Sequence, residues 1–206
     1  MLALFPLSIV LFPESVFRLH IFETRYKNLV NDCIENDTHF GINPIIAGKI
    51  METGCTAKVI EVLKRYPNGK MDIFVRGIKR YTLKVTSISP REYMLADVDL
   101  IDEDFIYPDA GLLEECILLF NKIAKEVKSL GLKKVDATMF YTVTPSYFFA
   151  EKSGMSIKQK YHLLNLNSEQ KRLEYLREHL RDVEPMLRQS ETIHQLIKND
   201  GYAKRF

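Results

Sequence analysis

Cysteine is scarce in this sequence, and its thiols are too far apart for a disulfide framework or a structural zinc site. Cys33, Cys55 and Cys116 are odd in number and form no C-x-x-C motif. Disulfide-rich secreted domains and zinc ribbons are therefore disfavoured as classes. A reducing compartment fits this usage, and we expect a cytoplasmic protein.

Neither an excess of one charge nor a long apolar run is present. Lysine plus arginine number 29 and aspartate plus glutamate 27, so no strong field favours nucleic acid or anionic lipid. No apolar run approaches the roughly 18 residues of a membrane-spanning helix. Residues 2–17 lack a basic start and contain Pro6 and Pro13, which favours a folded strand over a signal peptide. We expect no membrane partner.

Recognisable catalytic and cofactor motifs are also missing. Gly48-Lys49 lacks both the upstream glycine and the following serine or threonine of a P-loop. No two histidines stand at i, i+4, and we interpret His20 with Glu23 as structural residues rather than metal ligands. Ser168 and Lys171 match the S-x-x-K of some acyl enzymes, but a helix start explains both more simply. We expect no catalytic residue, metal or cofactor, and a peptidase is the least favoured alternative.

Strand patterns dominate the first hundred residues. Alternating or β-branched apolar residues predict strands at 17–21, 56–66, 71–76, 81–85 and 94–100. Pro67-Asn68-Gly69 predicts a hairpin turn with Gly69 at positive φ. One helix follows the first strand, because apolar residues recur at helical spacing in Phe22, Tyr26, Leu29, Val30 and Cys33.

Helical patterns dominate the remainder, after an acidic linker that follows Ile101. The apolar period of 113–127 predicts one helix, and Thr144-Pro145 predicts the start of another. Two further helices are predicted to begin at the capping-box spacings Ser156/Gln159 and Asn167/Gln170.

The last helix carries an apolar seam on a charged background. Its members are Leu173, Leu176, Leu180, Val183 and Leu187. Such a seam predicts a partner surface. Pro185 is expected to kink or end this helix, because it removes a backbone donor.

Several of these segments together resemble the Lon protease amino-terminal (substrate-binding) domain. The first carriers of the resemblance are Phe5-Pro6-Leu7, Val10-Leu11-Phe12-Pro13 and Leu19-His20-Ile21-Phe22-Glu23-x-Arg25-Tyr26. It continues through Phe40-Gly41, Gly54-Cys55-Thr56-Ala57-Lys58-Val59, Val75-Arg76-Gly77, Arg80-Tyr81 and Ser156-x-x-Gln159-Lys160, and covers most of residues 1–185. Glu14 and Arg18 depart from the family's glycine and proline.

The resemblance implies an α+β fold. We expect a PUA-like antiparallel β pseudo-barrel with one helix in residues 1–102, and a helical bundle ending in a long helix in 103–206. It also implies a non-catalytic module, without ATPase or peptidase domain, that recognises unfolded or specific polypeptides or docks onto a larger protease. An RNA-binding PUA-like module is the alternative.

The junction of two lobes is a common place for an apolar binding surface, so we expect aromatic residues to gather there. Our candidates for polypeptide binding are Phe5, Phe12, Tyr26, Tyr147 and Phe149. The alternative partner surface is the seam at Leu180, Val183 and Leu187, through which the chain could also self-associate weakly.

Overall fold

The chain forms two compact units. A computed structural model describes residues 1–102, 108–127, 131–141 and 144–202, with the side chains of the last helix described through Met186 and at Gln189. Unit 1 comprises Met1–Glu103 and Ser156–Asn165, and unit 2 comprises Asp104–Met155 and Leu166–Phe206. The division differs from the expected one in a single segment, because Ser156–Asn165 groups with the strand-rich part.

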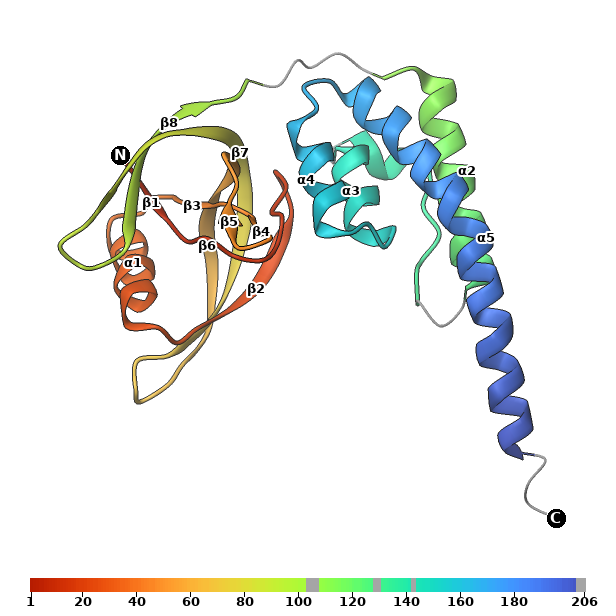
Figure 1. Ribbon diagram of the computed structural model, residues 1–206, viewed down its shortest axis with the longest axis horizontal. Helices are drawn as coiled ribbons and strands as arrows, with labels where there is room; N and C mark the ends of the chain where they lie inside the picture. The colour runs from red at the N-terminus through yellow and green to blue at the C-terminus, as the bar shows by residue number, and fades with distance from the viewer. Residues whose placement is uncertain (103–107, 128–130, 142–143, 203–206) are drawn as a thin grey trace. The chain divides into compact units, whose positions relative to one another are not determined.

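Unit 1 is built on a six-stranded sheet with one helix inside the strand sequence (Figure 1). The helix is α1 (Thr24–Glu35). The sheet strands are β1 (Leu2–Leu4), β2 (Val16–Ile21), β3 (Phe40–Ile42), β6 (Thr53–Arg65), β7 (Met71–Ile88) and β8 (Met94–Leu100), while β4 (Ile45–Ile46) and β5 (Lys49–Ile50) form a separate pair.

The strand pairings of the main sheet return on themselves. The order is β2-β7-β6-β3-β1-β8, and β8 also pairs with β7. The α+β fold class is therefore confirmed, but the sheet is mixed rather than antiparallel, because β1 and β3 run parallel. The strand expected to end near residue 76 continues as β7 to Ile88. Its first half pairs with β2 and its second half with β8, so one long strand serves two sets of neighbours.

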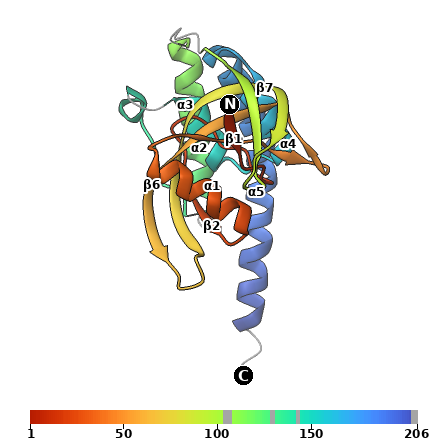
Figure 2. The ribbon, with the colours of Figure 1, turned by 90° about the vertical axis from the view of Figure 1, so that its left-hand side faces the viewer.

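The hairpin between β6 and β7 follows the predicted turn chemistry. Gly69 has φ +77°, and its N–H donates to the Tyr66 carbonyl at 2.9 Å. The Tyr66 N–H in turn donates to the Lys70 carbonyl at 2.9 Å. The tip of this hairpin projects beyond the rest of unit 1 in both ribbon views (Figures 1 and 2).

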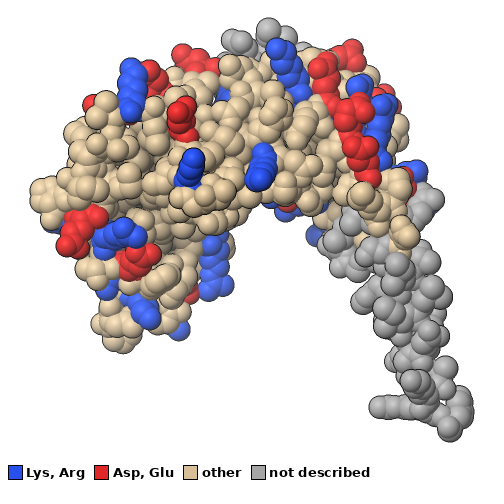
Figure 3. All heavy atoms as spheres, viewed as in Figure 1, with Lys and Arg blue, Asp and Glu red and all other residues tan. Residues whose placement is uncertain are grey.

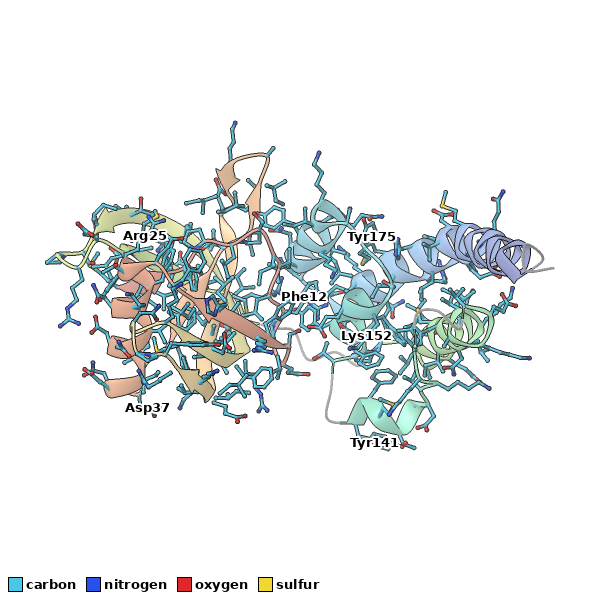
Figure 4. All side chains as sticks on the ribbon, turned by 90° about the horizontal axis from the view of Figure 1, so that it is seen from below. Phe12, Arg25, Asp37, Tyr141, Lys152 and Tyr175 are labelled. Carbon is cyan, nitrogen blue, oxygen red and sulfur yellow. The ribbon has the colours of Figure 1, made fainter. Side chains whose placement is uncertain are left out.

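Helix α1 packs one apolar stripe onto the sheet. Tyr26, Leu29, Val30 and Cys33 are buried at the predicted spacing. Phe22 was expected on the same stripe and is 57% exposed instead, because the helix begins after Glu23 and leaves Phe22 in the preceding extended segment. Arg25 and Asp37 lie at opposite ends of the helix (Figure 4).

Helix α4 (Ile157–Asn165) belongs to unit 1 because buried polar contacts hold it against β6 and β7. The fully buried Arg80 donates from its guanidinium to the Leu164 carbonyl at 2.5 Å. Thr53 donates from its hydroxyl to the Asn165 side-chain oxygen at 2.6 Å. The predicted capping box is confirmed, since Gln159 accepts from the Ser156 N–H at 2.9 Å and the Ser156 hydroxyl accepts from the Gln159 N–H at 3.3 Å.

Unit 2 is helical in its described residues. Its elements are α2 (Ala110–Glu126), the 3-10 helix η2 (Ala137–Tyr141), α3 (Pro145–Lys152) and α5 (Glu169–Tyr202). Thr144 and Pro145 begin α3 as predicted. Helix α5 is capped by Ser168, one residue after the predicted Asn167, because the Ser168 hydroxyl accepts the Lys171 N–H at 3.2 Å.

Helix α5 continues past Pro185 to Tyr202, so the proline does not end it. Its first turns pack on α2, and the two helices are joined at their surface by ion pairs of Glu115 with Arg177 and Arg181 and of Lys122 with Glu184. Among the described residues no helix is both long and apolar enough to cross a membrane.

Candidate functional site

The aromatic candidates from the sequence are all buried. Phe5 and Tyr26 stack with ring centroids 4.0 Å apart in the core of unit 1, and Phe12 is fully enclosed. Phe149 lies against Phe120 at 5.3 Å, while the Arg172 guanidinium lies 4.7 Å above the Tyr147 ring. Their role in polypeptide binding stays an untested prediction, and the structure corrects the expectation that they form an exposed surface.

The reason for their burial is local. Phe5 and Tyr26 belong to the strand and helix faces that close the core, and Tyr147 and Phe149 turn inward from the short helix α3. Among the residues of unit 2 whose side chains the structure describes, the exposed aromatic is Tyr141, at 84%, which lies on η2 (Figure 4). Periodicity alone cannot tell a packed ring from an exposed one when both lie near a segment end.

The apolar seam of α5 has a partner within the chain over its first half. Leu173, Leu176 and Leu180 are fully buried, and the Cys116 thiol of α2 lies 3.6 Å from the Leu173 carbonyl. Val183 is half-buried. The side chain of Leu187 lies outside the described residues. The expectation that the seam is a free partner surface is therefore corrected at Leu180, because other residues of the same chain cover that side chain.

Exposed apolar side chains gather instead on the outer face of the sheet in unit 1, the face turned away from α1. We call this set the outer apolar patch. Its members come from the neighbouring strands β2, β7 and β6 and from the segment after β2: Val16, Phe22, Ile60, Leu63 and Ile78 are each between 39% and 57% exposed.

Two irregularities in β6 expose two of the five members of this patch. The pairing with β7 shifts between Val59 and Glu61 and again between Val62 and Lys64. Each shift adds one unpaired residue, so Val59 and Val62 keep packing on the core while Ile60 and Leu63 turn to solvent. Simple alternation along residues 56–66 would place Val59 with Leu63 on one face and Ile60 with Val62 on the other. That assignment is wrong because a β-bulge resets the facing of every residue beyond it.

A polar cluster of side chains around Asp72 borders the patch, beside the C-terminal half of β2. The Asp72 carboxylate accepts from Arg18 at 3.0 Å and from the Tyr66 hydroxyl at 3.0 Å, and it lies 2.7 Å from the His20 ring nitrogen. His20 thus pairs with Asp72 rather than with Glu23, which instead pairs with Arg25 at 2.8 Å. These hydrogen bonds, from His20 first and Arg18 next, lower the pKa of Asp72 from 3.8 to about 2.

This shift predicts a loss of stability in acid. A carboxyl whose pKa is lowered on folding stabilises the native state fully above its ordinary pKa and loses that contribution as the pH falls through its folded value. We therefore expect Asp72→Asn to lower the melting temperature at neutral pH, with a difference from the wild type that shrinks as the pH falls from 3.8 towards about 2. The exposed Asp97→Asn is the control. A difference that stays constant over that range in melting curves followed by circular dichroism would contradict the assignment.

An open depression of about 510 Å³ lies beside the end of α1. Asp32 on its wall accepts hydrogen bonds from Tyr93 at 3.0 Å and from Arg91. Burial raises the pKa of the nearby Cys33 thiol, which keeps it protonated and poorly nucleophilic. In the part of the chain that the structure describes, no group of three or more histidine, cysteine, aspartate and glutamate side chains could hold a metal ion.

Comparison with known proteins gives the site its context. The sequence model of the ATP-dependent protease La (LON) substrate-binding domain matches residues 1–182. The chain belongs to this family. The match is to the substrate-binding domain, and no ATPase or peptidase domain is found beside it. A member of the Lon substrate-binding domain family is a substrate-binding module.

Solved Lon amino-terminal domains share the fold. One is a Lon N-terminal domain protein from Xanthomonas campestris, whose sequence is 25% identical to that of this chain. Its crystal structure matches with a TM-score of 0.64 over 85% of this chain and 95% of that one. The N-terminal domain of the Mycobacterium avium complex Lon protease is 18% identical with a TM-score of 0.69, covering 88% and 98%. Among the curated protein sequences compared, none matches this chain significantly.

The serine and lysine of the S-x-x-K match have structural roles. Ser168 caps α5 through its hydroxyl, which accepts the backbone N–H of Lys171. The Lys171 side chain is exposed. A nucleophilic serine needs a base within hydrogen-bond reach, and the hydroxyl of Ser168 is instead engaged by the backbone that it caps.

Proposed function

We propose that this protein is a non-catalytic module that binds polypeptide segments on the outer apolar patch. The observation that carries the proposal is the exposure of five large apolar side chains, four on the neighbouring strands β2, β7 and β6 and one in the segment after β2. Exposed apolar side chains that adjoin one another mark interaction surfaces in proteins. Family membership supports the same conclusion, because the family is defined by substrate binding.

The chemistry of the patch favours a polypeptide over a small molecule. The patch is an outer sheet face, whereas drug-sized ligands prefer concave pockets that enclose most of their surface. Apolar side chains alternate there with Arg18, Arg76 and Glu61, so a bound chain would meet both apolar and charged groups. An unfolded polypeptide offers both kinds of group along its length.

Nucleic acid fits this surface less well. The net formal charge is only +2. On the face shown in Figure 3, basic and acidic side chains are interspersed over unit 1. Binding to a phosphate backbone requires several lysine or arginine side chains that act together. The RNA-binding alternative therefore gains no support from the charges on this face.

The proposal predicts which exposed residues matter for capture. We expect Ile60→Ser with Leu63→Ser to weaken binding of a fluorescein-labelled, reduced and carboxymethylated lactalbumin by about thirtyfold or more, because hot-spot truncations cost about 2 kcal/mol or more. The matched control is Val85→Ser with Ile88→Ser, which replaces two equally apolar and more exposed residues elsewhere in unit 1. Fluorescence anisotropy measures binding, and both variants should keep their unfolding free energy within about 1 kcal/mol of wild type.

Two results would contradict the proposal. Equal loss of binding in the patch variant and in the control would mean that nonspecific hydrophobic binding, rather than the patch, captures the polypeptide. Failure of the wild type to bind the unfolded lactalbumin would exclude the activity itself. Docking onto a larger protease, self-association through α5 and a cytoplasmic location stay predictions.

A further inference from the structure

Strand β2 is an edge of the main sheet in unit 1 along its whole length, because its only partner among the described strands is β7. Within the described residues β1, β3, β6 and β8 each pair with two strands and β7 pairs with three, whereas β2 pairs with β7 alone. An edge strand presents a row of backbone N–H and C=O groups that can pair with another extended chain. This open edge lies directly beside the outer apolar patch, to which Val16 belongs.

The register shows which backbone groups face outward. The Gly77 N–H donates to the Ser15 carbonyl at 2.9 Å, and Phe17 and Leu19 stand opposite Val75 and Ile73. Hydrogen-bonded and non-hydrogen-bonded pairs alternate along an antiparallel ladder. Phe17 and Leu19 therefore bond to β7. The alternate residues Val16, Arg18 and His20 direct their N–H and C=O groups away from it.

The side chains of the same residues define what this edge can accept. Arg18 is 63% exposed at the centre of β2, even though it contacts Asp72. Arg76 lies directly across from Val16 in the register and is also exposed. No carboxylate among the described residues pairs with Arg76. An incoming strand that carries acidic residues on the outer face would meet the Arg18 guanidinium, with the positive charge of Arg76 one strand further in. An apolar residue on its other face would meet the half-buried Phe17.

We propose that β2 captures an extended polypeptide segment by adding it to the sheet, with alternating acidic and apolar side chains as the preferred sequence. This inference rests on the proposed function and specifies the substrate class and binding mode. A second copy of this chain is a poorer occupant. Antiparallel pairing of two β2 strands about Arg18 would place two guanidinium groups opposite each other, and like charges directly opposite are destabilising.

The decisive experiment compares backbone with side-chain recognition. The probe is a fluorescent peptide of about ten residues with alternating valine and glutamate, long enough for one strand. Its partner is the same peptide with N-methyl groups on its central amides, which keeps every side chain and removes the donors. Strand addition depends on main-chain hydrogen bonds, so we expect binding to fall by about tenfold or more in the methylated peptide.

Two variants at one position separate backbone from charge in the protein itself. Arg18→Pro removes the outward N–H, which the ladder with β7 does not use, and proline is tolerated on edge strands with that orientation. Arg18→Ala removes the charge and keeps the N–H. We expect Arg18→Pro to weaken binding of the unmethylated peptide about tenfold more than Arg18→Ala does, and Arg18→Ala to reduce the salt dependence of binding.

The outcomes separate this inference from the proposed function. Equal binding of the methylated and unmethylated peptides would overturn strand addition while leaving side-chain capture on the patch intact. A dimer of the wild type that Arg18→Pro dissociates would assign the edge to a second copy and also overturn the inference. Should Arg18→Pro not fold, the two peptides still decide the question with the unaltered protein.

Discussion

Replacing Gly77 with alanine should unfold or severely destabilise unit 1. A Cβ atom at this position would lie 2.0 Å from the Phe12 carbonyl oxygen and 3.2 Å from the Cys55 sulfur. The Phe12 carbonyl cannot move away freely, because the turn that follows it is hydrogen-bonded to Gly77. The Gly77 N–H donates to the Ser15 carbonyl at 2.9 Å, and the Glu14 N–H donates to the Gly77 carbonyl at 2.8 Å. Overpacking of this kind against fixed backbone should cost about 3 kcal/mol or more.

Urea unfolding followed by fluorescence of the tyrosines measures this effect, with a midpoint lowered by about 1 M or more at an m-value of about 3 kcal/mol/M. The matched control is Gly111→Ala in α2. There the new Cβ meets only the Asp109 side chain at 3.2 Å, and alanine favours a helix more than glycine does. A loss at Gly77 no larger than that at Gly111 would show that the turn after Phe12 yields without cost.

Replacing Arg172 with methionine should have the largest effect in unit 2. Arg172 and Glu169 form a buried ion pair at 2.9 Å, with side chains only 3% and 8% exposed. The Ser146 hydroxyl and N–H donate to the same carboxylate at 2.6 and 2.8 Å. Removing one partner of a buried pair lowers the free energy of unfolding by about 3 to 5 kcal/mol, because it leaves the other charge unpaired in a poorly solvated site.

A double-mutant cycle isolates the pair from the other contacts of Arg172. We expect Glu169→Gln combined with Arg172→Met to be more stable than Arg172→Met alone, with a coupling of about 2 kcal/mol, since a neutral amide removes the buried charge. Additive losses in urea unfolding would show that Arg172 acts through its other contacts, among them the Leu166 carbonyl at 2.9 Å, the Ser146 hydroxyl at 3.0 Å and the Tyr147 ring.

The same variant carries a pH signature. Burial raises the pKa of the Glu169 carboxyl, while Arg172 lowers it. Without Arg172 the folded carboxyl would hold its proton to a higher pH than the unfolded one. The loss of unfolding free energy caused by burying this carboxylate without a partner is then absent below the unfolded pKa and grows as the pH rises through that value. The deficit of Arg172→Met should therefore shrink when unfolding is repeated at acidic pH.

Short-range features of this protein were predictable because their causes lie within a few residues. The hairpin turn at Gly69, the stripe from Tyr26 to Cys33 and the cap of Ser156 by Gln159 each depend on local spacing. The cap of α5 shows the limit of such reasoning. Asn167 and Ser168 are both good N-cap residues, and only the position of the helix on unit 2 selects Ser168.

The candidate surface was not predictable, because it arises from pairing between strands. Ile60 and Leu63 are exposed only since β6 is irregular against β7, and a bulge is a property of two strands together. The open edge of β2 likewise depends on β8 returning to β7 rather than to β2. Neither fact is written in the pattern of any single segment.

By itself, the sequence determined the family, the α+β class and the positions of most strands and helices, because hydrophobic periodicity and turn residues act locally. Only the tertiary structure decided which apolar side chains remain outside. In the folded protein Phe12 and Phe149 are buried and Phe22 is exposed. Helix α4 packs in the strand-rich unit, where the buried Arg80 donates a hydrogen bond to it. Such choices depend on contacts between residues far apart in the chain, where burial of one side chain is settled by the packing of all its neighbours.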